Sequence, residues 1–161
     1  MKICETDPTS PEARAILEQS WRYLRAKFPS EERFHLDVAR LRARNVDFFL
    51  ATEGGMAVGC AAFVRQAEHW GEIKSMYVIP GARGSGIAQG LLEHLEATAR
   101  LAGCRMLRLE TVEDLDVAVD FYARHGFERR ATVAGDAMGG DTIFMEKNLA
   151  PETDDAASRA G

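Results

Sequence analysis

The sequence predicts a single α/β domain of the α+β type, in which a mixed and mostly antiparallel sheet is flanked by helices. Three β-rich runs, at residues 46–52, 57–65 and 71–79, follow one another with short connections, which favours consecutive antiparallel strands. An amphipathic helix from residue 86 then separates the third run from a fourth at residues 105–112. Because such a crossover places its flanking strands side by side and parallel, we expect one parallel pair in the sheet.

Length and composition are those of one soluble domain. The 161 residues, of which 46% are hydrophobic and 28% charged, suffice for one sizeable core. We expect this domain to span residues 1–149, and residues 150–161, which lack periodicity, to form a disordered tail. No apolar run approaches the length of a membrane span and the first residues lack a signal-peptide pattern, so we expect a cytoplasmic protein without a membrane partner.

Charge and cysteine spacing narrow the function classes. The formal net charge of −5 argues against a nucleic-acid partner, which needs clustered Lys and Arg, and is compatible with a cationic substrate such as an amine. Cys4, Cys60 and Cys104 are widely spaced and form no C-x-x-C motif. This predicts buried reduced thiols and neither a disulfide framework nor a metal site.

A long helix is predicted before the sheet. Ser10 and Pro11 fit its cap and first residue, and apolar residues recur at helical spacing to about Phe28. Trp21 and Tyr23, near the end of this helix, are interpreted chiefly as core residues.

The remaining elements are shorter. Residues 2–5 could form an edge strand, and a second helix is predicted from a cap at Ser30 to about residue 41. Glu53 to Met56, with two glycines, is a hairpin signal between the first two strands of the sheet. After the fourth strand, a cap at Asp114 or Asp116 begins a helix that stops at Gly126, and the last strands are expected at residues 127–133 and 141–147.

Strand alternation assigns side chains of the 71–79 run to two faces. Glu72, Lys74, Met76 and Val78 are expected on one face of the strand. Ile73, Ser75, Tyr77 and Ile79 are expected on the opposite face.

A glycine-rich turn follows this strand and leads into the crossover helix. Gly84 and Gly86 can adopt backbone angles closed to other residues, and the amides at the helix start favour an anion. Arg83 adds a positive charge, so a phosphate or pyrophosphate is the expected ligand. The sequence contains neither G-x-x-x-x-G-K-[ST] nor G-x-G-x-x-G, since Gln89 stands at the third glycine position. The alternative is a strand-to-helix turn that binds nothing.

Further segments accompany this turn in a fixed order. The turn reads R-G-S-G-I-A at residues 83–88, strands are expected at residues 72–78 and 106–112, and A-V-D-F-Y-A-R-H-G-F follows at residues 118–127. Together they resemble the R/Q-x-x-G-x-G/A signature, the fourth and fifth strands and the A-x-x-F/L-Y-x-x-x-G-F/Y motif of the GNAT superfamily of acyl-CoA-dependent N-acyltransferases. The resemblance extends over residues 46–149.

The resemblance implies acetyl-CoA as co-substrate, held between the two parallel strands, which must splay to admit it. Backbone amides of the turn would hold the pyrophosphate, and the end of the preceding strand would pair with the pantetheine arm. The expected coenzyme-binding residues are Met76, Tyr77, Val78, Arg83, Gly84, Ser85, Gly86, Ile87, Ala88 and Phe121. No metal is expected.

The resemblance also implies catalytic roles. Tyr122 matches the family's general acid toward the coenzyme A sulfur, with a buried structural tyrosine as the alternative. Glu72 and Glu110 are the candidate bases, acting directly or through water, and Glu72 is preferred; His69 is a third option. Each carboxylate is also explicable as a solvated strand residue or an ion-pair partner.

The implied function is an N-acetyltransferase acting on an amine of a small molecule, peptide or protein. The alternative is a non-catalytic acyl-CoA-binding module, because Leu115 stands where many relatives carry Asn or Gln. In the family the N-terminal helices line the acceptor pocket, which gives Trp21 and Tyr23 an alternative role in substrate binding. Homodimers are common in the family and are an open expectation here.

Overall fold

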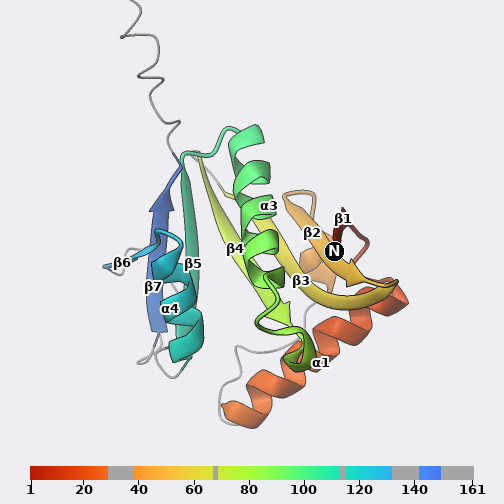
Figure 1. Ribbon diagram of the computed structural model, residues 1–161. Helices are drawn as coiled ribbons and strands as arrows, with labels where there is room; N and C mark the ends of the chain where they lie inside the picture. The colour runs from red at the N-terminus through yellow and green to blue at the C-terminus, as the bar shows by residue number, and fades with distance from the viewer. Residues whose placement is uncertain (29–37, 67–68, 113–114, 132–141, 150–161) are drawn as a thin grey trace, which may run out of the picture.

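The computed structural model describes residues 1–28, 38–66, 69–112, 115–131 and 142–149, which form a seven-stranded sheet flanked by helices (Figure 1). The strands are β1 (Lys2–Glu5), β2 (Val46–Glu53), β3 (Met56–Arg65), β4 (Trp70–Val78), β5 (Met106–Val112), β6 (Glu128–Arg130) and β7 (Thr142–Asn148). Their order in the sheet is β1-β2-β3-β4-β5-β7-β6, and β4 and β5 are the only parallel neighbours among them. The predicted mixed sheet with one parallel pair is thus confirmed.

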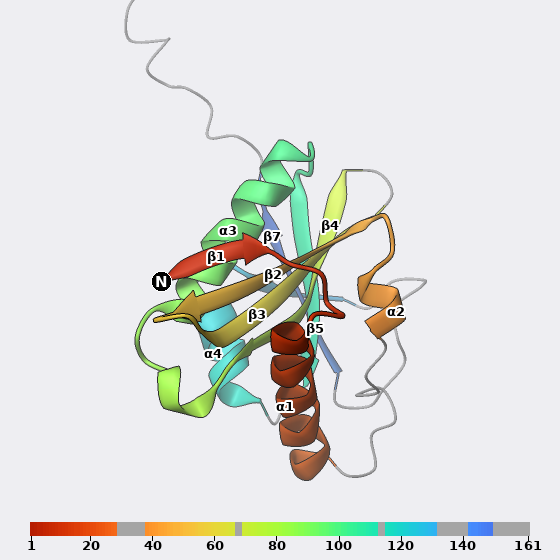
Figure 2. The same cartoon turned by 90° about the vertical axis from the view of Figure 1, so that its right-hand side faces the viewer.

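Helices cover both faces of the sheet. They are α1 (Pro11–Lys27), α2 (Val38–Leu41), α3 (Ile87–Leu101) and α4 (Asp116–Arg124), with a 3-10 turn, Pro80–Ala82, before α3. Helices α3 and α4 lie on one face and α1 on the other (Figures 1 and 2). The backbone amide of Ala13 donates to Ser10 Oγ, which confirms the predicted cap of α1. In the described ranges, no helix combines the length and apolarity needed to cross a bilayer.

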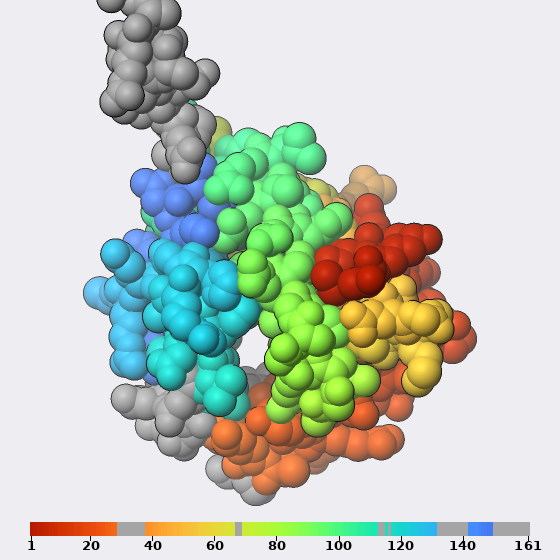
Figure 3. All heavy atoms as spheres, viewed as in Figure 1, coloured from red at the N-terminus to blue at the C-terminus, as the bar shows by residue number. Residues whose placement is uncertain are grey.

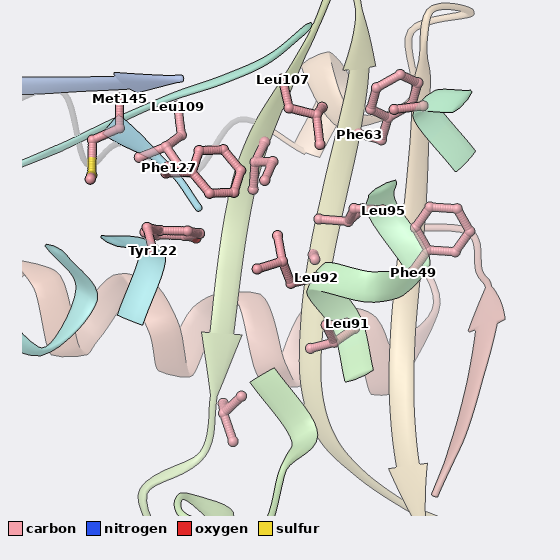
Figure 4. Close-up of a cluster of buried hydrophobic side chains, with 14 of the residues drawn as sticks. Phe49, Phe63, Leu91, Leu92, Leu95, Leu107, Leu109, Tyr122, Phe127 and Met145 are labelled. Atoms are coloured by element: carbon pink, nitrogen blue, oxygen red, sulfur yellow. The ribbon is translucent and has the colours of Figure 1, made fainter. Parts of the chain in front are cut away.

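Two hydrophobic cores fix these layers. The larger joins α3 and α4 to the sheet, with Leu91, Leu92 and Leu95 of α3 buried in one cluster with Phe63 and Leu107 (Figure 4). Burial of each such side chain contributes roughly 1.5–3 kcal/mol. The smaller core, which contains Ile16 and Leu17 of α1, lies on the opposite face. Helix α3 is therefore anchored across the middle of the sheet.

Turn chemistry accounts for several predicted boundaries. Gly54 and Gly55 have φ of +55° and +80°, which confirms the hairpin between β2 and β3. Gly103 and Gly126, also at positive φ, follow α3 and α4 as predicted.

Two boundary predictions were wrong. The N-cap of α4 is Leu115, without a side-chain cap, and Asp116 is already the first helical residue. Strand β6 runs only from Glu128 to Arg130, so Phe127 and Ala131 lie outside it. Strand β7, Thr142–Asn148, agrees with the predicted last strand to within one residue. All three cysteines were predicted to be buried reduced thiols. Cys60 and Cys104 are buried and free, whereas Cys4 is exposed. Ser30, Asp114 and residues 150–161 lie outside the described residues.

Candidate active site

The parallel strands β4 and β5 separate along their length. Their pairing is confined to Trp70 with Met106, Gly71 with Leu107 and Glu72 with Arg108. Beyond Glu72 the strands diverge toward their carboxyl ends, as Figure 1 shows. The facing backbone edges there have no ladder partner within the described chain, so an extended molecule can pair with them.

A β-bulge shapes β4 where the strands part. Cys60 of β3 pairs with Tyr77 and Ala62 with Lys74, so Ser75 and Met76 together oppose a single residue. Ser75 has φ of +54°, an uncommon angle for a residue other than glycine. The buried Cys60 Sγ donates to the Ser75 carbonyl oxygen at 3.2 Å, which holds the bulge.

The bulge overturns the predicted faces of β4. Lys74, which pairs with Ala62, lies on the α1 face of the sheet, whereas Met76 and Val78 pack into the core on the α3 face. Tyr77 lies on the α1 face. The alternation was therefore wrong beyond Ser75, because the inserted residue shifts every later side chain to the other face.

A cavity of about 380 Å³ occupies the opened part of the sheet. It is lined by β4 and β5, by α1 and α2 from one face and by α4 from the other. Figure 3 shows the molecule hollowed between α4, in cyan, and the segment leading into α3, in green, with α1 in orange below. The space is therefore reached from both faces of the sheet, and a co-substrate and an acceptor can meet inside it.

Tyr122 of α4 lines this cavity while its side chain is largely buried. The residue is 6% exposed and makes edge-on contacts with Phe121 and Phe127, at centroid distances of 5.2 and 5.4 Å. Figure 4 places it at the α4 side of the core. Burial raises the pKa of the Tyr122 hydroxyl, so the group stays protonated at neutral pH and can donate a proton.

The two candidate carboxylates occupy different places. Glu110 of β5 is exposed and lines the cavity with Tyr122. Glu72 is absent from the lining: its Oε1 lies 3.1 Å from Lys74 Nζ, and its Oε2 accepts a hydrogen bond from Gln66 Nε2. His69 also lies outside the lining. Of these three, the structure brings only Glu110 to the cavity wall.

The glycine turn presents free backbone amides. Gly84 and Gly86 have φ of +82° and +85°, and a Cβ on either would meet no atom within 4 Å. In the described part of the chain, the amides of residues 84–88 donate no backbone hydrogen bond, and Ser85 Oγ closes the turn by donating to the Ala82 carbonyl. Unpaired amides at the start of α3 are a suitable cradle for a phosphate.

The other predicted coenzyme residues surround this opening. Met76 lines the cavity, and Val78 and Ile87 are buried in the α3-side core. Ala88 is partly buried against the same core. Phe121 packs between Tyr122 and His125, and its ring lies 4.4 Å from the His125 ring.

Arg83 and the aromatic residues of α1 have positions that the sequence did not reveal. The Arg83 guanidinium lies over the rings of Tyr23 and Tyr77, and its Nε donates to the Val78 carbonyl at 3.0 Å. Trp21 lines the cavity and Tyr23 is 36% exposed, so their interpretation as core residues was wrong. Helical spacing identifies an inward face but does not distinguish a core from a cavity wall.

In the described ranges, no group of His, Cys, Asp and Glu side chains is arranged to hold a metal ion. The site combines open strand edges and the buried Tyr122 at the cavity with unpaired backbone amides at the start of α3. This suits a co-substrate with an extended amide chain and a phosphate group, as in an acyl-coenzyme A. The geometry of the site thus fits an acyl-transfer enzyme.

Comparison with known proteins agrees. The chain belongs to the acetyltransferase (GNAT) family, whose model matches residues 12–127. It is 34% identical over 148 residues to the IAA acetyltransferase of Azospirillum brasilense, which covers 91% of this chain and 97% of that protein. The protein is therefore an acyltransferase of this family.

Solved structures show the same fold. A Klebsiella pneumoniae protein assigned to the acyl-CoA N-acyltransferases is 32% identical, with a TM-score of 0.74 over 92% of this chain and 97% of that one. The PaiA N-acetyltransferase of Thermoplasma acidophilum, solved in complex with coenzyme A, is 20% identical, with a TM-score of 0.70 over 92% of this chain and 99% of that one.

Proposed function

We propose that this protein transfers the acetyl group of acetyl-CoA to a primary amine of a small molecule, peptide or protein, by direct attack of the amine on the thioester. The observation that carries the proposal is the cavity between β4 and β5, where Tyr122 and Glu110 line one space. The acetyltransferase family of the chain supports the reaction type.

The residues of the opened sheet fit the coenzyme. Amides of residues 84–88 bind its pyrophosphate, because they start α3 without acceptors and no side chain obstructs Gly84 or Gly86. The free edge of β4 pairs with the amide groups of the pantetheine arm. When bound, acetyl-CoA supplies a thioester carbonyl that is reactive toward a neutral amine.

Three groups of the protein serve the transfer. A backbone N–H at the bulge, near Met76, polarises the carbonyl and stabilises developing negative charge on its oxygen. Glu110, directly or through water, removes the proton of the incoming ammonium, because it is the candidate carboxylate on the cavity wall. Tyr122 donates a proton to the departing sulfur.

The acceptor enters from the side of α1 and α2. Trp21 and Leu24 of α1 provide an apolar wall there, and the cavity suits a small molecule or a single side chain. The relatives include an IAA acetyltransferase and the 5-NmdU N-acetyltransferase of Pseudomonas phage PaMx11, the latter 30% identical over 145 residues. Since these names indicate different acceptors, the proposal is limited to the amine class.

Thermal unfolding and turnover together test the proposal. Acetyl-CoA at 100 times its dissociation constant should stabilise the fold by about 2.7 kcal/mol, whereas NAD at the same concentration should not shift the midpoint. Release of free thiol should then depend on an added amine in a broad panel. Binding without turnover on any amine would favour a non-catalytic acyl-CoA-binding module, and no shift with acetyl-CoA would refute both functions.

A further inference from the structure

Arg83 stands at the junction of three elements. Its backbone immediately precedes Gly84, its Nε donates to the carbonyl of Val78 at the end of β4, and its guanidinium lies over Tyr23 of α1. The guanidinium carbon is 5.1 Å from the centroid of the Tyr23 ring and 5.7 Å from that of the Tyr77 ring. The Arg83 side chain thus contacts both the end of β4 and helix α1.

The two rings form one aromatic surface for this cation. Their centroids are 6.2 Å apart with the planes tilted by 48°. Burial raises the pKa of Tyr77 and the nearby Arg83 charge opposes that rise, as expected for a cation held against the ring. A planar guanidinium can stack on such rings and donate to a carbonyl at the same time, which a lysine ammonium cannot reproduce.

The turn that follows needs such an anchor. Gly84 and Gly86 both adopt positive φ, and a Cβ added to either would meet no atom within 4 Å, so neighbouring side chains do little to define the turn. A ligand that binds an undefined turn must first order it, which lowers affinity. The residue that fixes the first backbone position of the turn therefore affects every amide after it.

We infer that Tyr23 and Arg83 form a clamp that holds the glycine turn in its open-amide geometry, so that a residue of α1 positions the coenzyme site. Tyr23 and Arg83 are then positioning residues that act through the turn. The inference rests on the proposed binding of coenzyme A by residues 84–88. It differs from a role in which Arg83 contributes its charge directly to a phosphate.

The two roles predict different substitution patterns for coenzyme A binding, measured by titration calorimetry at two salt concentrations. The clamp predicts that Arg83→Lys and Arg83→Gln weaken binding alike, by about fivefold, because both lose the stacking and the Nε donor. Tyr23→Leu should weaken binding similarly, whereas Tyr23→Phe, which keeps the ring, should bind as the wild type does.

The clamp also predicts that losses of coenzyme A affinity are non-additive when both residues are replaced. The double variant Tyr23→Leu/Arg83→Gln should bind no more weakly than Arg83→Gln alone, because the first change already breaks the shared contact. Arg22→Gln is the matched control on α1, since Arg22 is exposed and pairs loosely with Glu18. Full binding by Arg83→Lys with a reduced salt dependence in Arg83→Gln, or additive losses in the double variant, would overturn the clamp.

Two readouts separate a positioning role from general stability and from the proposed function. Tyr23→Leu should raise KM for acetyl-CoA more than it lowers kcat, which loss of stability alone would not do. Without any ligand, the same variant should speed hydrogen exchange at Ala82 and Arg83, whose amides donate to the Ile79 and Pro80 carbonyls at the start of the turn, and leave the β2–β3 hairpin unchanged. If the wild type binds no coenzyme A, the proposed function fails; unchanged exchange at Ala82 and Arg83 would refute the clamp itself.

Discussion

Tyr122 combines burial with access to the cavity. Its ring packs against Phe121 and Phe127, which fixes the direction of the hydroxyl, while the side chain still lines the space between β4 and β5. Burial raises the pKa of the hydroxyl above the ordinary tyrosine value near 10. The group therefore stays protonated, and able to donate a proton, at neutral pH.

Replacing Tyr122 by Phe should lower kcat by about 10²-fold or more, in the range for loss of a general acid, with a much smaller change in coenzyme affinity. The ring and its packing are kept, so the fold should be unaffected. Steady-state rates and calorimetric affinities measure the two effects separately. Equal losses in both would contradict the acid role.

The pH dependence of kcat follows from the raised pKa of Tyr122. An acid must be protonated to act, so activity is lost only as pH rises through its pKa. Because burial raises that pKa, kcat in the wild type should show no alkaline decline due to this group below about pH 10. A decline below that pH that disappears in Tyr122→Phe would refute the assignment.

Cys60 offers a prediction about stability. Burial raises the pKa of its thiol from 9.0 to about 12 in the folded protein. The protonated thiol therefore adds stability that is complete below pH 9 and lost as pH rises from 9 toward 12, at about 1.4 kcal/mol per pH unit.

Cys60→Ser should remove this part of the alkaline decline and keep a donor for the Ser75 carbonyl. Urea unfolding at pH 8, 9.5 and 10.5 measures the free energy of unfolding of both proteins. Cys4→Ser is the matched control, because Cys4 is exposed and should leave the slope unchanged. Parallel slopes for wild type and Cys60→Ser would contradict the prediction.

At the scale of elements, periodicity predicted most strands and helices, but it failed within β4. Alternation requires a regular strand, and the bulge at Ser75 depends on how β3 pairs across it. No residue in the local sequence specifies that pairing. The glycine turn and Tyr122 were selected from motifs. For Trp21, helical spacing favoured the core and left the pocket as the alternative, because a cavity wall exists only once α1 faces the opened sheet.

The two ends of α3 provide matched glycines for a test of the turn. Gly86 caps the N-terminus at φ +85° and Gly103 follows the C-terminus at φ +81°, both in open space. Alanine at either position should cost about 1 kcal/mol of stability, because the left-handed region strains a Cβ. Only Gly86→Ala should also weaken coenzyme A binding, by about tenfold or more, since its methyl group would obstruct the approach to the amides.

Thermal unfolding measures the stability of Gly86→Ala and Gly103→Ala, and titration calorimetry measures their affinity for coenzyme A. Similar stability losses with coenzyme affinity lowered only in Gly86→Ala would support the cradle. Unchanged affinity in Gly86→Ala, or an equal loss in Gly103→Ala, would place the phosphate elsewhere.

At the scale of the molecule, strands β4 and β5 are hydrogen-bonded at one end of the sheet and separated at the other. Besides the three residue pairs of β4 and β5, Lys147 Nζ of β7 lies 2.7 Å from Oε1 of the buried Glu96 on α3. At the same end, the backbone amide of Arg105 donates to the His69 carbonyl, and the amide of Leu149 donates to the Arg105 carbonyl. The opening is therefore part of the folded protein, and a coenzyme would enter a gap that the fold already holds apart.

Amide hydrogen exchange tests this arrangement directly. Coenzyme A should slow exchange at two places, the turn at residues 84–88 and the open edge of β4 at residues 73–78, because its pyrophosphate and its pantetheine amides bind there. ATP, which carries phosphates on an adenosine but no pantetheine arm, should protect the turn alone if it binds. Strand β1, at the far edge of the sheet, should be unaffected by either ligand.

Equal protection of β4 by both ligands would mean that the turn rigidifies the strand from a distance, and protection spread evenly over the sheet would mean general stabilisation. Protection of β4 by coenzyme A alone would identify the pantetheine arm as the strand that occupies the gap.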